Sequence, residues 1–197
     1  MKALRQIILS CLVVLSFSTT VYSLAPMANT AGFGGKIGLN IVDNEGAAFG
    51  WGAHFLYGFD LRGAGTLAIY PNVEFWVHRN DYFDRSYDPD RLYHVTLFQT
   101  NINFDARYYF PIKGNIPVNP FVGFGFGPDI TSWNPESPYY FDQYNYYRDT
   151  DVSVLFSFFG GIDIPISSNI RPFFEMRIKP VGYYTVFKMT AGLTFLL

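Results

Sequence analysis

The sequence is poor in charge and in cysteine, and little of its length forms a long apolar run. Among its 197 residues there is one Cys, and charged residues make up 15%, against about 25% in ordinary soluble domains. A single Cys excludes a disulfide scaffold and a zinc site built from cysteines. The net charge of −2 and the lack of a basic run exclude a nucleic-acid-binding surface. We therefore expect no nucleic-acid partner, no metal and no cofactor.

Residues 1–28 are typical of an export signal. Lys2 and Arg5 precede an apolar stretch over residues 7–17, which is too short to cross a bilayer of about 30 Å as a helix. Val21 and Ser23 stand where a signal peptidase reads small residues. This layout predicts a signal peptide over residues 1–23, with cleavage after residue 28 as the alternative, and export from the cytoplasm.

Aromatic residues make up 20% of the chain. From residue 33 onward, apolar residues alternate with polar or small ones. In residues 95–110, for example, Phe98, Ile102 and Phe104 alternate with Gln99 and Asn103. Alternation with a period of two predicts strands, and the chain shows no capped pattern with the helical period. The predicted strands are 34–41, 47–61, 66–78, 95–110, 118–128, 152–164, 170–178 and 187–197. Pro71 and Pro172 fall inside two of them, where we expect bulges or, as the alternative, strand boundaries shifted by a few residues.

The connections indicate how the eight strands are arranged. Residues 62–65, 111–117 and 165–169 are short turns, whereas residues 79–94 and 129–151 are long loops on the opposite side. Short turns at one end and longer loops at the other are typical of an all-β, eight-stranded antiparallel up-and-down transmembrane β-barrel. A soluble, lipocalin-like barrel that binds a ligand in the periplasm is the alternative, and it would turn the apolar face inward.

The volume of the apolar face favours the transmembrane barrel. An eight-stranded barrel is only just wide enough for side chains to fill it, and the rings of this face would overfill it. We therefore expect these rings to face lipid: Phe49, Trp51, Phe55, Tyr57, Phe59, Phe75, Phe98, Phe104, Tyr108, Phe110, Phe124, Phe126, Phe156, Phe158, Phe174, Phe187 and Phe195.

Over residues 33–197 the chain resembles the small outer-membrane β-barrel family, the OmpA/OmpX-like and opacity-protein-like group. The last strand carries the most specific part of the resemblance, although it ends in Leu197 with its last ring at Phe195. The resemblance implies an outer-membrane protein of a diderm bacterium that contacts outer-membrane lipids. It also implies that the outer-membrane assembly machinery reads the terminal strand, in particular Phe187, Met189, Leu193, Phe195 and Leu197.

If the polar face lies inward, it places a set of acids and bases in the lumen. Burial of unpaired charge is costly, so we expect these groups to pair. If the turn at 180–183 pairs Ile178 with Thr185, Glu175 stands opposite Lys188, and the turn at 165–169 likewise places Asp163 opposite Arg171. We expect a structural plug, with an ion or water path as the alternative. The predicted network comprises Glu74, Asp105, Arg107, Asp163, Arg171, Glu175, Arg177 and Lys188, with Lys36, Asp60, Arg62 and Lys179 on the same face.

These features favour a structural or surface-interaction role, with the loops 79–94 and 129–151 as contact surfaces for an extracellular partner. Aromatic residues in the second loop suit either adhesion or a membrane-interface girdle: Tyr139, Tyr140, Phe141, Tyr144, Tyr146 and Tyr147. The alternative is a lipid-modifying enzyme of the deacylase or acyltransferase type, for which His78, Glu74 and Ser153 are the candidate catalytic residues. The His-x-Ser pattern of such enzymes is absent, so we do not expect an enzyme.

Overall fold

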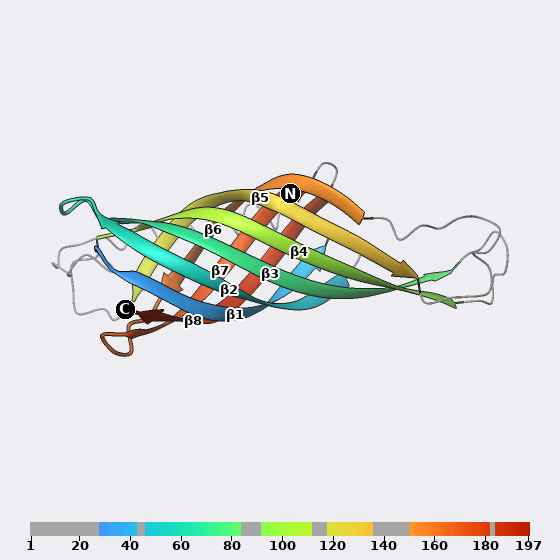
Figure 1. The fold of residues 1–197 in the computed structure, drawn as a ribbon, viewed down its shortest axis with the longest axis horizontal. Helices are drawn as coiled ribbons and strands as arrows, with labels where there is room; N and C mark the ends of the chain where they lie inside the picture. The colour runs from blue at the N-terminus through green and yellow to red at the C-terminus, as the bar shows by residue number, and fades with distance from the viewer. Residues whose placement is uncertain (1–27, 43–45, 84–91, 112–117, 136–149, 182–183) are drawn as a thin grey trace, which may run out of the picture.

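The computed structural model describes residues 28–42, 46–83, 92–111, 118–135, 150–181 and 184–197, so the predicted signal peptide lies outside the described residues. Each strand pairs antiparallel with its neighbours in the chain, and β1 pairs with β8 to close the barrel (Figure 1). The predicted eight-stranded up-and-down barrel is confirmed. The strands are β1 (Ala31–Val42), β2 (Gly46–Asp60), β3 (Thr66–Phe83), β4 (Leu92–Tyr109), β5 (Asn119–Pro135), β6 (Thr150–Asp163), β7 (Ile170–Val181) and β8 (Tyr184–Leu196).

Several strands extend beyond their predicted ends. β3 continues to Phe83 and β5 to Pro135, while β6 begins at Thr150, so parts of the predicted loops 79–94 and 129–151 are strand. These extensions are rich in polar residues and therefore resemble loops in the sequence. Main-chain pairing holds them in ladders: the β3–β4 hairpin continues to Phe83 and Leu92, the end of β5 pairs with β4, and the start of β6 pairs with β5. Figure 1 shows this hairpin extending beyond the other strands at the end opposite the short turns.

The registers together give the barrel a shear of ten residues. Followed once around the barrel from Ala31, the pairing returns to β1 ten residues further along, at Ile41, by the path Ala31, Tyr57, Ile69, Ala106, Phe124, Phe158, Ile178, Phe187 and Ile41. Ten residues over eight strands tilt the strands by about 40° from the barrel axis. Eight strands at this tilt enclose a lumen that side chains can fill.

Neither proline makes a bulge in the described ladders. The β2–β3 ladder has no pair at Tyr70 or Pro71, yet its register is the same on both sides of the gap, and Pro71 stays paired with Phe104 of β4. Pro172 lies near the start of β7, where its carbonyl accepts a hydrogen bond of 2.8 Å from the main-chain N–H of Ile164. The bulges predicted at these two prolines are therefore wrong. Proline has no main-chain N–H, so it can leave a residue of the neighbouring strand without a hydrogen bond while the register stays the same.

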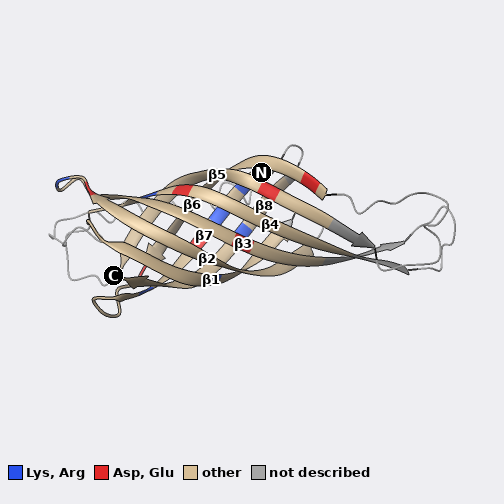
Figure 2. Cartoon of the chain, in the orientation of Figure 1, with Lys and Arg blue, Asp and Glu red and all other residues tan. Residues whose placement is uncertain are grey.

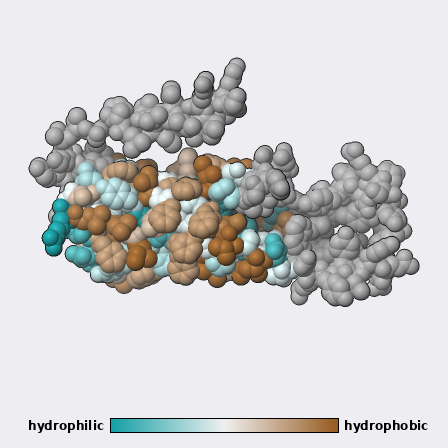
Figure 3. Space-filling view, turned by 90° about the horizontal axis from the view of Figure 1, so that it is seen from above, coloured by the Kyte–Doolittle hydropathy of each residue, from teal (hydrophilic) through white to brown (hydrophobic). Residues whose placement is uncertain are grey.

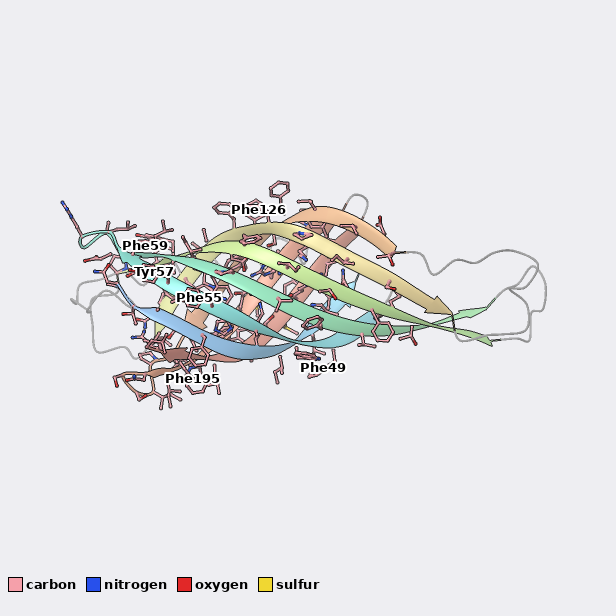
Figure 4. All side chains as sticks on the ribbon, in the orientation of Figure 1. Phe49, Phe55, Tyr57, Phe59, Phe126 and Phe195 are labelled. Atoms are coloured by element: carbon pink, nitrogen blue, oxygen red, sulfur yellow. The ribbon has the colours of Figure 1, made fainter. Side chains whose placement is uncertain are left out.

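Side chains alternate between the lumen and the outer face of the barrel. Along β2, for instance, residues 47–59 alternate strictly between exposed and buried. The rings predicted to face outward are exposed or half-buried, and the six rings labelled in Figure 4 point away from the barrel. Figure 3 shows hydrophobic residues over the side wall of the face in view, with a hydrophilic group at the short-turn end. This arrangement is the reverse of a soluble lipocalin-like barrel, and that alternative is wrong for this fold.

The described ranges contain strands and turns, and no helix in them is long and apolar enough to cross a membrane.

Candidate functional site

A network of buried charged side chains occupies the lumen, on strand segments near the middle of the barrel (Figure 2). Its first centre is Glu74 of β3, which is 1% exposed. One carboxylate oxygen lies 2.5 Å from Nζ of Lys36 on β1, and the other lies 3.0 Å from Nζ of Lys188 on β8. The indole N–H of Trp76 donates to the same carboxylate at 3.2 Å. Glu74 thus pairs with two cations, one on each of the strands β1 and β8 that close the barrel.

The second centre is Arg177 of β7, which contacts two acids. Its guanidinium makes a two-pronged ion pair with Asp105 of β4 and also donates to Glu175 at 3.0 Å. Glu175 in turn accepts a bond of 2.6 Å from Arg107. Asn72 donates to Asp105 at 2.9 Å and accepts from Lys36 at 2.7 Å, which connects the two centres. Bidentate and charge-assisted bonds of this kind are the strong ones in proteins.

Aromatic rings surround the guanidinium of Arg107. The guanidinium carbon lies 3.3 Å from the ring centroid of Tyr70 and 4.6 Å from that of Phe121. Face-on packing of this kind lets an arginine keep its charge in a dry site. The two rings belong to a buried apolar cluster that comprises Leu56, Ala68, Tyr70, Tyr109, Phe121, Phe159 and Leu196.

A third group involves a residue that the sequence interpretation missed. Asp129 of β5 lies 3.3 Å from Nζ of Lys179 and accepts two hydrogen bonds, at 2.7 and 2.8 Å, from the amide of Gln99. We expected Asp129 to begin a loop, because Pro128 precedes it. Asp129 continues the alternation of the inward-facing glycines at 123, 125 and 127, and this alternation could have placed it in the lumen.

Comparison with known proteins gives matches of fold. No protein-family model matches the chain, and no curated protein sequence matches it. Among solved structures, neisserial surface protein A aligns with a TM-score of 0.54 at 14% identity, over 84% of this chain and 96% of that one. Ail of Yersinia pestis, solved with the heparin analogue sucrose octasulfate, aligns with a TM-score of 0.51 at 9% identity, over 85% and 97%.

The N-terminal β-barrel domain of Pseudomonas aeruginosa OprF aligns with a TM-score of 0.50 at 12% identity, over 86% of this chain and 98% of that one. The fold is that of the small outer-membrane β-barrels. This agrees with the resemblance expected from the sequence. At these identities the likeness concerns the fold, so the role of each residue rests on the geometry of this chain.

The structure changes two of the predicted pairings. In the β7–β8 hairpin Lys188 stands opposite Arg177, and Glu175 stands opposite Thr190. The predicted Glu175–Lys188 pairing is therefore wrong. The tight hairpin, in which Val181 pairs with Tyr184, shifts the register by two residues from the one assumed.

At the other turn, Asp163 stands opposite Phe173 and not Arg171. The two charges still approach, with 3.9 Å between Arg171 Nη1 and Asp163 Oδ1. Asp60 and Arg62, which we expected in the lumen, are exposed at the β2–β3 turn, where Asp60 accepts a hydrogen bond of 2.9 Å from the main-chain N–H of Arg62. Asp60 is the last residue of β2 and Arg62 lies in the turn beyond it, so both side chains are at the rim of the barrel and not in the lumen.

The structure does not assemble the three candidate catalytic residues into a hydrogen-bonded group. Glu74 is bound by Lys36, Lys188 and Trp76. Both ring nitrogens of His78 are buried without a hydrogen-bond partner among the described residues. Ser153 lies on β6, paired with Asp129 of β5 and separated from β3 by two strands. Within the described ranges no group of three or more His, Cys, Asp or Glu side chains could hold a metal ion.

The remaining predicted positions lie at the ends and on the outer face. The aromatic residues at 139–147 are outside the described residues. The residues of the terminal strand implied as the assembly signal all point outward, from half-buried Phe187 and Met189 to Leu197, which is 76% exposed. β8 pairs with β1 from Val186 to Leu196, so the terminal strand closes the barrel.

Proposed function

We propose that the chain is an integral outer-membrane protein of a diderm bacterium, exported by its signal peptide. The observation that carries this proposal is the inside-out distribution of its side chains, with rings outside and charges inside. On β2 the outward apolar residues run from Phe49 to Phe59. Ten residues at a rise of about 3.3 Å and a tilt of about 40° cover about 25 Å, which is the height of the apolar band in outer-membrane barrels.

The role we propose is structural or in surface interaction, with the lumen closed by its charge network. The buried side chains of Lys36, Glu74, Asp105, Arg107 and Arg177 occupy the middle of a barrel that is narrow by its strand number. The surfaces left for a partner are the end regions 79–94 and 129–151. Membrane lipids and the assembly machinery are the further partners we propose.

Membrane fractionation followed by electrophoresis tests this placement. We expect the protein in the outer-membrane fraction, retained there after alkaline washing and released by detergent. In SDS, an unboiled sample should migrate differently from a boiled one, because a closed barrel resists unfolding by SDS without heat. Recovery from a detergent-free soluble fraction, with the same mobility before and after boiling, would contradict the proposal.

A further inference from the structure

The seam between β6 and β7 is the shortest ladder of the barrel. It pairs residues 158–163 with 173–178, whereas β6 pairs with β5 along its whole length. On the same offset, Pro180 would stand opposite Phe156, and Val181, the last residue of β7, opposite Leu155. Proline has no N–H to donate, and beyond Val181 the strand ends. Within the described residues, the start of β6, toward Thr150, therefore pairs with a neighbouring strand on one side only, that of β5.

The hydrogen-bond pattern identifies the main-chain groups that this leaves free. Ile164 donates its N–H to Pro172 of β7, and in an antiparallel strand alternate residues direct their N–H and C=O to the same side. The even-numbered residues of β6 therefore face β7. The odd-numbered Asp151 and Ser153 face β5, where they pair with Thr131 and Asp129. Along residues 150–154, the N–H and C=O groups of Thr150, Val152 and Val154 face a side where no described strand lies.

Side chains give this edge two chemically different sides. On the outer side, Val152 and Val154 are 60% and 63% exposed. On the lumen side lie Ser153 and the exposed Asp151, which forms no ion pair with a described residue. A strand added here would place its outward residues beside the valines and its inward residues beside the carboxylate.

We propose that residues 150–154 of β6 are a docking edge for an extended peptide segment of a partner protein, with apolar residues on one side and basic residues on the other. This inference rests on the proposed function in one respect, namely that the loop end of the barrel faces outward. An open strand edge is a template for strand addition. Five residues match the length of an ordinary strand.

A second copy of this chain does not fit the edge. Two barrels in one membrane are related by an axis along the membrane normal, so their β6 strands, each tilted by about 40°, would cross at roughly twice that angle. Strands that cross so steeply cannot form a ladder, because neighbouring strands in a sheet differ by about 20–25°. A separate peptide segment can adopt the tilt of β6.

Amide hydrogen exchange of the refolded protein in detergent micelles tests the free edge directly. We expect Val152 and Val154 to exchange at least tenfold faster than Asp151 and Ser153, because only the latter pair with β5. A blocked seven-residue peptide of alternating Lys and Val should slow exchange at the two valines. Equal protection of all four amides would show that the edge is already occupied and would overturn the proposal.

Peptide binding, followed by fluorescence anisotropy, tests the recognition. Val152→Pro removes an N–H that faces the free edge and leaves the β5 ladder intact, so we expect at least fivefold weaker binding. Val152→Ala, which keeps the N–H, is the matched control and should change binding less than twofold. A Glu/Val peptide should bind at least fivefold more weakly than the Lys/Val peptide, and Asp151→Lys should reverse this preference.

Two results would overturn the proposal: binding of the Lys/Val peptide unchanged by Val152→Pro, or no binding to the wild-type protein. Circular dichroism and the mobility of unboiled samples check that each variant is folded. Failure of peptide binding would leave the membrane fractionation result unaffected, so this inference and the proposed function fail separately.

Discussion

Replacement of Glu74 by Gln should be among the most destabilising single changes in the lumen. Glu74 accepts charge-assisted bonds from Lys36 at 2.5 Å and from Lys188 at 3.0 Å. Each bond to a charged group contributes about 1.5–3 kcal/mol. Removing one member of a buried ion pair costs about 3–5 kcal/mol, since the other charge stays buried. We therefore expect Glu74→Gln to lower the free energy of unfolding by about 3–5 kcal/mol.

Urea unfolding in micelles, followed by tryptophan fluorescence and by electrophoretic mobility, measures this change. A second substitution, Lys36→Met, should destabilise the wild-type protein but recover about 1 kcal/mol or more in the Glu74→Gln background, because it removes one uncompensated cation. Asp60→Asn, at an exposed turn, is the control and should stay within about 0.5 kcal/mol. A loss below about 1 kcal/mol for Glu74→Gln, or simple additivity with Lys36→Met, would refute the reasoning.

Three further outcomes follow from the packing, the lipid face and the closed lumen. Gly50→Ala would push a methyl group into the ring of Trp76 and the main chain at Phe75, whereas a methyl group at the outward Gly35 would make an ordinary contact of 3.7 Å with the main-chain oxygen of Gly52. Urea unfolding should show a loss of about 1–3 kcal/mol for Gly50→Ala and little change for Gly35→Ala. Phe158 lies midway along the apolar outer side of β6, so Phe158→Arg should lower the free energy of unfolding in lipid vesicles by about 2–4 kcal/mol. The same substitution at Val152, near the rim of the barrel, should lower it by about 0–1 kcal/mol. In planar bilayers the wild-type protein should show no steady conductance, and Arg177→Ala should produce openings; a steady conductance in the wild type would contradict the closed lumen.

The fold was predictable from the sequence because alternation with a period of two is a local property. Each side chain's face depends only on its parity within a strand, and the excess of rings decides which face meets lipid. Strand ends were less predictable, since the upper parts of β3 and β5 are polar and are held by pairing with β4. Nothing in their composition separates such a strand from a loop.

The partners within the network were harder to predict than its members. A hairpin register wrong by two residues leaves every side chain on its correct face, so Glu175 and Lys188 were placed in the lumen correctly but paired with each other wrongly. Lys188 contacts Glu74 of β3, and Glu175 contacts Arg107 of β4 as well as Arg177 two residues along its own strand. Long side chains reach across a narrow lumen, so strand neighbours do not determine the ion pairs.

This geometry links ion pairing to barrel closure. In the β7–β8 hairpin two cations, Arg177 and Lys188, stand directly opposite each other, which is unfavourable in an isolated hairpin. Arg177 also pairs with Glu175 of its own strand, but Asp105 on β4 and Glu74 on β3 reach the two cations only across the lumen. An open sheet would leave Lys188 without Glu74 and Arg177 with Glu175 alone, whereas the closed barrel supplies all three acids. The charge network therefore stabilises the closed state specifically, and removing an acid should weaken closure more than it weakens any single hairpin.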